Sequence, residues 1–494
     1  MTRRFVFATV LPLLLVASLA CRGRPPVHQG PIVLITVDAL RADAVGALGG
    51  RPGLMPAFDA LAAEATWSGR AVSPSSWTVP SMGSIFTGFQ PWSVGNWESH
   101  VVPESLTTLP EALRQQGYRT AAFRSNHWLD KEYGYAQGFD EFRYIRDGQR
   151  AEGYLEGLAG GRDFVWIHIL PPHAPYVRRA HLEDRLGDLA KDLPQRVRPL
   201  DLEPYFDPAV DPTEETRKAY HALYELNAAY ADELLGRMLA ALRRSGQWDA
   251  SLVVVTSDHG EEFSEHGQMA HGGNLGRVLL DVPLVVKLPK AFSRKLALEP
   301  AERPGNVRVP ATLVEAAGGS LGQGTSPSLF VPVDKGTLSE LYLGNGVNRY
   351  SLVQGDLQLL WESRFAPTEP EYYRARYEGL GGRPQPPLTE PSDAVFKRLE
   401  RRFAKALPLT GLPGSPPTLS LWRWNDAGSV RIEDRAAAER LARQLKNLWL
   451  AAHGAEALPG RGGERPKLSP EKERELRALG YVAALTPFSI APTP

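Results

Sequence analysis

The sequence predicts an α/β protein with a central, mainly parallel β-sheet. Three segments, 31–46, 163–177 and 251–263, each begin with a continuous hydrophobic run and end in polar residues. Continuous rather than alternating hydrophobicity is typical of strands that are buried on both faces of a parallel sheet. Helical patterns separate these segments, and strands that alternate with helices favour a doubly wound sheet.

The other elements of this region follow from the same patterns. We expect helices near 56–65, from Pro80 onward and over 212–245, a helix–turn–strand unit at 107–126, and a fourth buried strand at 281–289.

The pattern changes after about residue 330, which predicts a smaller C-terminal α+β subdomain. Residues 350–363 alternate around a Gly-Asp turn, as in a β-hairpin. A strand at 419–426 and an amphipathic helix at 433–452 are also expected, while 366–418 is rich in Pro, Arg and Glu and predicts surface loops with one helix. The predicted division is a main domain at 31–330, a C-terminal subdomain at 331–455, and a helical and loose tail at 456–494.

Residues 1–21 have the pattern of an export signal. Two arginines precede a hydrophobic run from Phe5 to about Ala20, which is short for a stable transmembrane helix. The run ends in "SLAC", which resembles a bacterial lipobox, and Cys21 is the only cysteine of the chain. We therefore expect a lipid on Cys21, a tether at 22–30, and an exported protein held at a membrane of the bacterial cell envelope, periplasmic or on the outer surface. An ordinary signal peptide cut nearby and an uncleaved anchor are the alternatives.

The charge balance argues against a polyanionic partner. Lys plus Arg and Asp plus Glu each number 56, so the formal net charge is zero. No basic surface is predicted, and nucleic acid is not expected as a partner. With one cysteine, an exported chain must be stable without disulfide bonds.

Polar side chains gather where the predicted strands end. Asp38, His173 and the pair Asp258-His259 each follow one of the three buried strands. Ligands bind at the carboxyl ends of the strands in such sheets, so these side chains are expected to share a site. Asp38, Asp258 and His259 suit one divalent cation: the oxygen ligands favour calcium, magnesium or manganese, and the imidazole permits zinc. Taken singly, each residue is also compatible with a turn or a helix cap.

The segment "SSWTVPSMGSIFTG" places Thr78 just before a predicted helix. A threonine there is either a helix cap or a nucleophile. A bound cation would lower the pKa of its hydroxyl, and a helix N-terminus favours an anionic substrate.

Three histidines are candidates for further roles around such an anion, and a fourth is expected to be structural. His173 and His271 are expected to donate hydrogen bonds to the anion or to protonate a leaving oxygen, with a structural role as the alternative for both. His266 is a weaker candidate, and His168 lies inside a strand and is expected to belong to the core.

Several motifs together resemble the sulfatase family of the alkaline phosphatase superfamily. Their order and spacing agree over about residues 30–290, and they read "ITVDALRAD", "SPSSWTVPSMGSIFTG", "LRQQGYRTAAF", "GFDEF", "WIHILPPHAPY", "TSDHGEEFSEHGQMAHGGNL" and "DVPLVV". The resemblance implies an alkaline-phosphatase-like sandwich with a smaller C-terminal sheet. It places Asp38, Asp258 and His259 at metal positions, with calcium as the implied ion, and His173 and His271 near the substrate anion.

The chain also departs from the family pattern. Thr78 stands where sulfatases keep the cysteine or serine that is oxidised to formylglycine, so no formylglycine is expected. Ala39, Met82, Ser125 and Pro171 replace an Asp, an Arg, a Lys and an Asp that the family uses.

The resemblance implies a metal-dependent hydrolase of sulfate esters that acts on a small-molecule or glycan ester. Two alternatives stay open. One is a phosphodiesterase or phosphoryl transferase of the same superfamily with Thr78 as its nucleophile, and the other is a catalytically inactive member that binds an anionic ligand.

Overall fold

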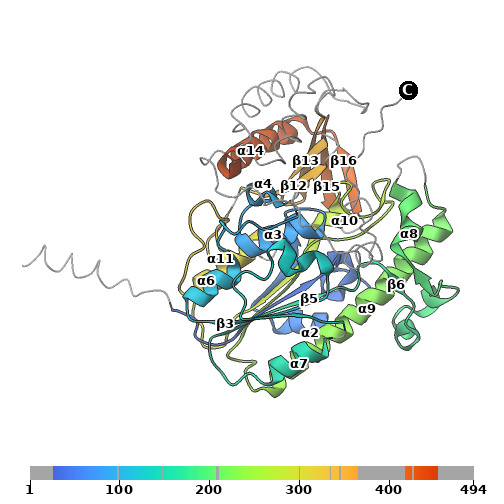
Figure 1. The fold of residues 1–494 in the computed structure, drawn as a ribbon. Coiled ribbons are helices and arrows are strands. Elements are labelled where there is room, and N and C mark those ends of the chain that lie inside the picture. The colour runs from blue at the N-terminus through green and yellow to red at the C-terminus, as the bar shows by residue number, and fades with distance from the viewer. Residues whose placement is uncertain are drawn as a thin grey trace, which may run out of the picture.

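The computed structural model describes residues 26–96, 100–146, 148–206, 211–299, 301–333, 335–343, 347–364, 418–425 and 428–453 (Figure 1). The predicted signal peptide, residues 22–25 of the tether, the loops at 366–417 and the C-terminal tail lie outside these residues.

A seven-stranded sheet forms the centre of the molecule, with the strand order β2-β11-β8-β1-β5-β3-β4. Its strands are β1 (Ile32–Val37), β2 (Trp67–Val72), β3 (Arg119–Arg124), β4 (Glu141–Tyr144), β5 (Asp163–Ile169), β8 (Leu252–Ser257) and β11 (Asp281–Lys287). The five strands from β8 to β4 are parallel, while β11 and β2 are antiparallel to their neighbours. The predicted mainly parallel α/β sheet is therefore confirmed, with an antiparallel pair added at one edge.

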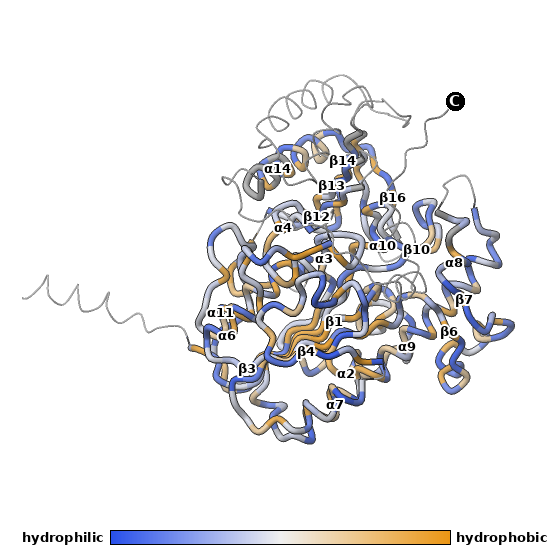
Figure 2. The backbone as a smooth tube through the Cα atoms, in the orientation of Figure 1, coloured by the Kyte–Doolittle hydropathy of each residue, from blue (hydrophilic) through white to orange (hydrophobic). Residues whose placement is uncertain are grey.

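Helices cover both faces of this sheet. Along β1, Val33 and Ile35 pack in one hydrophobic core and Ile32 and Leu34 in the other, as the alternation of a strand requires. The first core is shared with α2 (Pro56–Glu64), α7 (Gln149–Glu156) and the long α9 (Glu214–Arg244). The second is shared with α3 (Thr78–Thr87), α6 (Leu109–Gln115) and α11 (Val309–Ala316). Figure 2 shows the hydrophobic strands enclosed between these layers.

A second, antiparallel sheet lies at the top of Figure 1, and it matches the predicted smaller C-terminal unit. It consists of β12 (Thr337–Leu343), β13 (Val347–Gln354), β14 (Leu357–Arg364), β15 (Thr418–Asn425) and β16 (Gly428–Ile432). The amphipathic helix α14 (Arg435–His453) packs on it, with Leu441 and Leu445 against Leu352, Leu359 and Leu421.

Short elements connect these layers. They are η1 (Ala42–Ala44), η2 (Gly46–Leu48), α4 (Pro91–Val94), η3 (His127–Leu129), η4 (Lys131–Tyr133), β6 (Tyr176–Val177), η5 (Ala180–Arg185), η6 (Gly187–Ala190), β7 (Arg196–Val197), α8 (Pro199–Leu202), η7 (Glu203–Phe206), β9 (Glu262–Phe263), β10 (Met269–Ala270), α10 (Arg277–Leu280) and η8 (Asn306–Arg308). Within the described ranges, no helix combines the length and the hydrophobicity that crossing a membrane requires.

Candidate functional site

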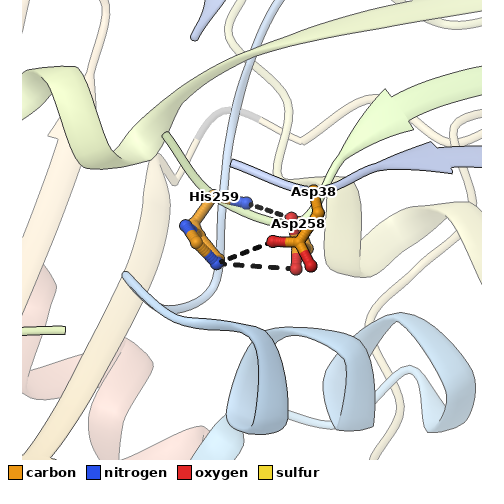
Figure 3. Close-up of side chains that lie close together, drawn as sticks. All are labelled: Asp38, Asp258 and His259. Atoms are coloured by element: carbon orange, nitrogen blue, oxygen red, sulfur yellow. Dashed lines mark hydrogen bonds and ion pairs between the residues drawn. The ribbon is translucent and has the colours of Figure 1, made fainter. Parts of the chain in front are cut away.

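Three of the residues predicted at strand ends lie together at the carboxyl edge of the central sheet. Asp38 follows β1, and Asp258 and His259 follow β8, which is paired in parallel with β1. One ligand atom from each residue lies within 4.8 Å of the others, and all three side chains are fully buried. Figure 3 shows both carboxylates facing the same edge of the imidazole ring.

The hydrogen bonds around the cluster leave one atom of each residue facing the others. Asp258 Oδ1 accepts from the backbone N–H groups of Ala39 and His259, at 3.2 and 3.0 Å. His259 Nδ1–H donates to the carbonyl of Gly260 at 2.8 Å, which leaves Nε2 with its lone pair for a ligand. Asp38 Oδ2 accepts from Asn126 Nδ2 at 2.6 Å. The second oxygens, Asp38 Oδ1 and Asp258 Oδ2, are buried and have no hydrogen-bond partner.

This donor set fits a divalent cation. Nε2 of His259 lies 3.5 Å from Asp38 Oδ1 and 3.6 Å from Asp258 Oδ2, so two carboxylate oxygens without a hydrogen-bond partner converge on this nitrogen. Burial and, second to it, the charge of Asp38 raise the pKa of Asp258. Burial also acts on Asp38, but His173, His168 and His259 outweigh it and lower the pKa of Asp38. Burial lowers the pKa of His259, which favours the neutral ring that a metal needs. Two buried carboxylate oxygens that face each other with no hydrogen-bond donor between them are unfavourable, and a bound cation would compensate their charge.

Thr78 completes this group from the helix layer. It is the first residue of α3 rather than its cap: the cap position is Trp77, and no side-chain capping bond is formed there. The Thr78 hydroxyl instead lies 3.2 Å from Nε2 of His259. The helix is held in place because the Ser81 hydroxyl donates to the carbonyl of Asp258 at 2.6 Å.

The C-terminal sheet fixes the loop that leads into α3. The Ser75 hydroxyl donates to the carbonyl of Glu340 in β12 at 2.7 Å, and the N–H of Glu340 donates to the carbonyl of Pro74 at 2.8 Å. Ser339 donates to the carbonyl of Ser73 at 2.6 Å. The loop is therefore held by strand-like contacts to a second layer, which limits the positions that Thr78 can adopt.

His271 lies beside the cluster and is hydrogen-bonded to a buried glutamate. Its ring centre lies 4.4 Å from that of His259, and its Nδ1 lies 2.7 Å from Oε1 of the buried Glu261. The other carboxylate oxygen of Glu261 accepts from the Tyr176 hydroxyl at 2.9 Å. Burial acts to raise the pKa of Glu261, but the charge and the hydrogen bond of His271 outweigh it and lower this pKa. The Glu261 carboxylate is thus an acceptor for Nδ1–H, and Nε2 is the nitrogen of His271 that is left for a substrate.

His173 also lies at this edge. Its ring centre is 4.9 Å from that of His271, and Nδ1–H donates to the carbonyl of Ala174 at 2.6 Å. His266 does not join the site: it lies 3.3 Å from Ser429 of β16. Met82 is fully buried in the core between α3 and the sheet.

Four residues around the cluster escaped the sequence-based prediction. Asn126 and His168 both bond to Asp38, at 2.6 and 3.2 Å, and Glu261 and Tyr176 support His271. His168 is buried in β5 as expected, yet it contacts a predicted ligand. Asn126 comes shortly after strand β3. Ligands bind at the carboxyl ends of the strands in such sheets, so the argument that pointed to Asp38 also points to Asn126.

Comparison with known proteins agrees with this geometry. The sequence model of the sulfatase family matches residues 31–319, more than half of the chain. An uncharacterized sulfatase, YidJ, of Escherichia coli (strain K12) is 21% identical over 321 residues, which cover 53% of this chain and 64% of that protein. The multifunctional alkaline phosphatase superfamily protein PehA of Trinickia caryophylli is 26% identical over 245 residues, 42% of this chain and 44% of that protein.

The chain thus spans about half to two thirds of the length of these two relatives. Among solved structures, the phosphonate monoester hydrolase SpPMH from Silicibacter pomeroyi shares the fold, with a TM-score of 0.52, 18% identity and coverage of 83% of this chain and 99% of that chain. The match of the family model to more than half of the chain shows that this protein belongs to the sulfatase family of the alkaline phosphatase superfamily.

Proposed function

We propose that the protein is a metal-dependent hydrolase of sulfate or phosphate esters in which Thr78 is the nucleophile. The observation that carries this proposal is the convergence of the Thr78 hydroxyl, two unpartnered carboxylate oxygens and Nε2 of His259 in one buried cluster. A buried cluster with this much unsatisfied charge costs stability, which is typical of sites kept for function.

The residues of the chain have separable roles in this proposal. Asp38, Asp258, His259 and the Thr78 oxygen would hold the cation. When bound, such an ion lowers the pKa of a coordinated hydroxyl and offsets the negative charge of the ester. Thr78 gives up its hydroxyl proton to water, and its Oγ1 forms a bond to sulfur or phosphorus as the bond to the leaving oxygen breaks. His271 supplies a proton from Nε2 to that oxygen. Water then attacks the Thr78 ester and returns one proton to His271, and Thr78 Oγ1 takes up the other as free sulfate or phosphate leaves.

Threonine at this position favours phosphorus over sulfur. A formylglycine hydrate can expel sulfate by collapsing to an aldehyde, whereas a secondary alcohol has no such route and must be released by attack at the central atom. Covalent phosphoenzymes resolved by water or by an acceptor alcohol satisfy this requirement. A phosphodiester or phosphonate monoester is therefore the second candidate substrate class, and the phosphonate monoester hydrolase fold of SpPMH is compatible with it.

The ion and the setting belong to the same proposal. Calcium, magnesium and manganese fit the two carboxylates and the hydroxyl, and zinc fits the imidazole. The substrate is a small-molecule or glycan ester. The N-terminal pattern supports export and attachment to a membrane of the cell envelope through Cys21.

One experiment separates the candidates. The purified protein is analysed for bound metals and then assayed with 4-nitrophenyl sulfate and bis(4-nitrophenyl) phosphate, with and without a chelator. Sulfate turnover that the chelator abolishes supports the sulfatase, and faster phosphodiester turnover supports the Thr78 phosphodiesterase. Absence of both metal and turnover would leave an inactive family member that binds an anionic ligand.

A further inference from the structure

A row of polar groups runs through the hydrophobic interior of the sheet and ends on Asp38. Its members are Trp166 and His168 of β5 and Thr36 of β1, and all three are fully buried. In the register of the two parallel strands, Thr36 is paired with His168, and Leu34 with Trp166. Leu34 and Trp166 pack in the core beneath α3, so the residues two positions further on, Thr36 and His168, face the same layer.

The distances join these side chains into one chain of hydrogen bonds. Trp166 Nε1 lies 3.0 Å from Thr36 Oγ1, and Thr36 Oγ1 lies 2.8 Å from His168 Nδ1. His168 Nε2 lies 3.2 Å from Asp38 Oδ2. The row thus crosses from β5 to β1, back to β5, and again to the residue that follows β1.

The direction of every bond follows from the chemistry of its donors. The indole Nε1–H of Trp166 can only donate, so Thr36 Oγ1 accepts from it. The Thr36 hydroxyl has one proton, and His168 Nδ1 is its remaining partner within the described part of the chain. Nδ1 is therefore the accepting nitrogen, the ring proton lies on Nε2, and Nε2–H donates to Asp38 Oδ2.

We propose that Trp166, Thr36 and His168 form a positioning relay that makes Asp38 a one-oxygen metal ligand. Asp38 Oδ2 is occupied by two donors, from His168 and from Asn126, whereas Oδ1 is buried without a partner and faces the cluster. The relay sets which nitrogen of His168 carries the proton, and thereby which oxygen of Asp38 is withheld from the cation. This inference rests on the proposed metal site and adds residues outside the ligand set to it.

Other roles of the row fit the contacts less well. A core histidine needs only to satisfy its own two nitrogens, and a bond to any carbonyl would achieve that. This histidine instead bonds to a carboxylate whose other oxygen has no hydrogen-bond partner and faces the predicted metal ligands. Supports of this kind around metal ligands typically change metal affinity by about 10- to 100-fold when they are removed.

The test uses Thr36→Val, which keeps the shape of the side chain and removes the hydroxyl that orients His168. Thr36→Ser restores the hydroxyl. The matched control is Thr256→Val: Thr256 is paired with Thr36 across the other neighbouring strand, is fully buried, precedes Asp258 as Thr36 precedes Asp38, and donates to the carbonyl of Pro283 at 2.9 Å. This control removes an equivalent buried hydroxyl that has no bond to a ligand.

The full-length protein and its variants are stripped of metal and titrated calorimetrically with Mn²⁺ and, in parallel, with Ca²⁺, well below the melting temperature of the metal-free form. We expect the Kd of Thr36→Val to rise by about 10- to 100-fold, with Thr36→Ser and Thr256→Val within about threefold of wild type. Unchanged affinity in Thr36→Val, or equal losses in Thr36→Val and Thr256→Val, would overturn the relay while leaving the proposed function intact. If the wild-type protein binds neither of these ions and neither Mg²⁺ nor Zn²⁺, both proposals fall.

A second variant covers the case in which Thr36→Val does not fold. His168→Gln offers an amide donor to Asp38 Oδ2 without any ring tautomer to set. His168→Leu has no such donor, so we expect it to lose Mn²⁺ or Ca²⁺ affinity by about tenfold or more while His168→Gln stays within about threefold of wild type; equal affinities in the two variants would contradict the relay.

Discussion

The hydroxyl oxygen of Thr78 lies 3.2 Å from Nε2 of His259, and both residues are fully buried where α3 meets the end of β8. A helix-capping threonine would direct this oxygen back toward the first N–H groups of its helix. Here the oxygen faces the ring nitrogen that the Gly260 carbonyl leaves available. The geometry therefore separates Thr78 from an ordinary cap and places it among the candidate ligands.

Substitution of Thr78 tests its role as a nucleophile. Thr78→Ala removes the attacking oxygen and is expected to lower the turnover of bis(4-nitrophenyl) phosphate, or of the aryl sulfate if that is the better substrate, by at least about a thousandfold. Thr78→Ser keeps a hydroxyl at the first position of α3 and should retain measurable turnover. Mass spectrometry of acid-quenched wild-type protein should detect the ester on residue 78. Full activity in Thr78→Ala would show that another group attacks.

Asp258→Asn should have opposite effects on stability and on metal binding. Oδ1 of Asp258 accepts two N–H bonds, so the amide nitrogen takes the place of Oδ2 and faces the acceptor Oδ1 of Asp38. The substitution removes one of the two buried negative charges that face each other, and it places an N–H donor between the two side chains. We expect the metal-free protein to gain about 2 kcal/mol in its free energy of unfolding.

The same variant should gain little from added metal. Thermal unfolding is measured for wild type and Asp258→Asn, with a chelator and with saturating Mn²⁺ or Ca²⁺. The wild type should be stabilised by the ion much more than the variant, since an amide is a weaker ligand than a carboxylate. A variant that is less stable than the wild type in the presence of chelator would contradict the electrostatic repulsion that we infer between the carboxylates of Asp38 and Asp258.

The cluster could be predicted from the sequence because it depends on topology. A continuous hydrophobic run predicts a buried strand, and parallel strands bring their carboxyl ends to one edge, so Asp38, Asp258 and His259 were expected to meet before any contact was known. Strand β2 was not predicted, because Ser, Gly and Arg interrupt its hydrophobic pattern. The start of α3 at Thr78 rather than Pro80 also follows from local chemistry, since proline in a first turn lacks only an N–H that has no partner in the helix.

The supports of the cluster could not be predicted in the same way. Hydrophobic patterning marks His168 as buried, but it does not tell which atom the ring contacts. Glu261 lies in a run of acidic residues that is typical of a solvated loop, yet it is fully buried between Tyr176 and His271. Such contacts arise from register and loop geometry, which depend on the whole fold.

Glu261 should matter most when the leaving group is poor. Glu261→Gln keeps the shape of the side chain, but it removes the negative charge beside His271, and a protonated imidazole then has no carboxylate to stabilise it. We expect turnover to fall by about 100-fold for an ester with an alkyl leaving group and by less than about tenfold for a 4-nitrophenyl ester, whose leaving group needs no proton.

The measurement is the dependence of kcat/KM on leaving-group basicity, which should become steeper in Glu261→Gln. Tyr176→Phe is the matched control, because it removes the other hydrogen bond to Glu261 and leaves the charge in place. A uniform loss for all esters in Glu261→Gln would indicate a structural role for this carboxylate instead.

Two neighbouring glutamates, Glu262 and Glu265, should affect stability with opposite dependence on pH. Glu262 is 1% exposed and accepts from the N–H of His266 and from Asn274 Nδ2, at 2.7 and 2.6 Å. Burial raises its pKa to about 7, from 4.5 for an unperturbed glutamate. The Glu265 side chain is 33% exposed and is paired with Arg41 at 2.6 Å. Partial burial acts to raise the pKa of Glu265, but the charge of Arg41 outweighs it and lowers this pKa.

The signs follow from proton binding. Between pH 4.5 and about 7, the folded chain keeps the proton on Glu262 while the unfolded chain loses it, so this residue makes stability fall as pH rises through that window, by up to about 3 kcal/mol. Glu265 has the lower pKa in the folded state, so its contribution is present above the pKa of the unfolded chain and is lost as pH falls through the folded value.

Urea unfolding of wild type, Glu262→Gln and Glu265→Gln from pH 3 to 8 measures both effects, with the metal content held constant. The free energy of unfolding of wild type minus Glu262→Gln should decrease as pH rises, since the amide cannot titrate. The same difference for Glu265→Gln should increase as pH rises toward 4.5 and then level off, because only the wild type gains the ion pair with Arg41. Parallel pH profiles for the three proteins would contradict the pKa shifts of both residues, and a change in Glu262→Gln with the sign of Glu265→Gln would show that the hydrogen bonds from His266 and Asn274 outweigh burial.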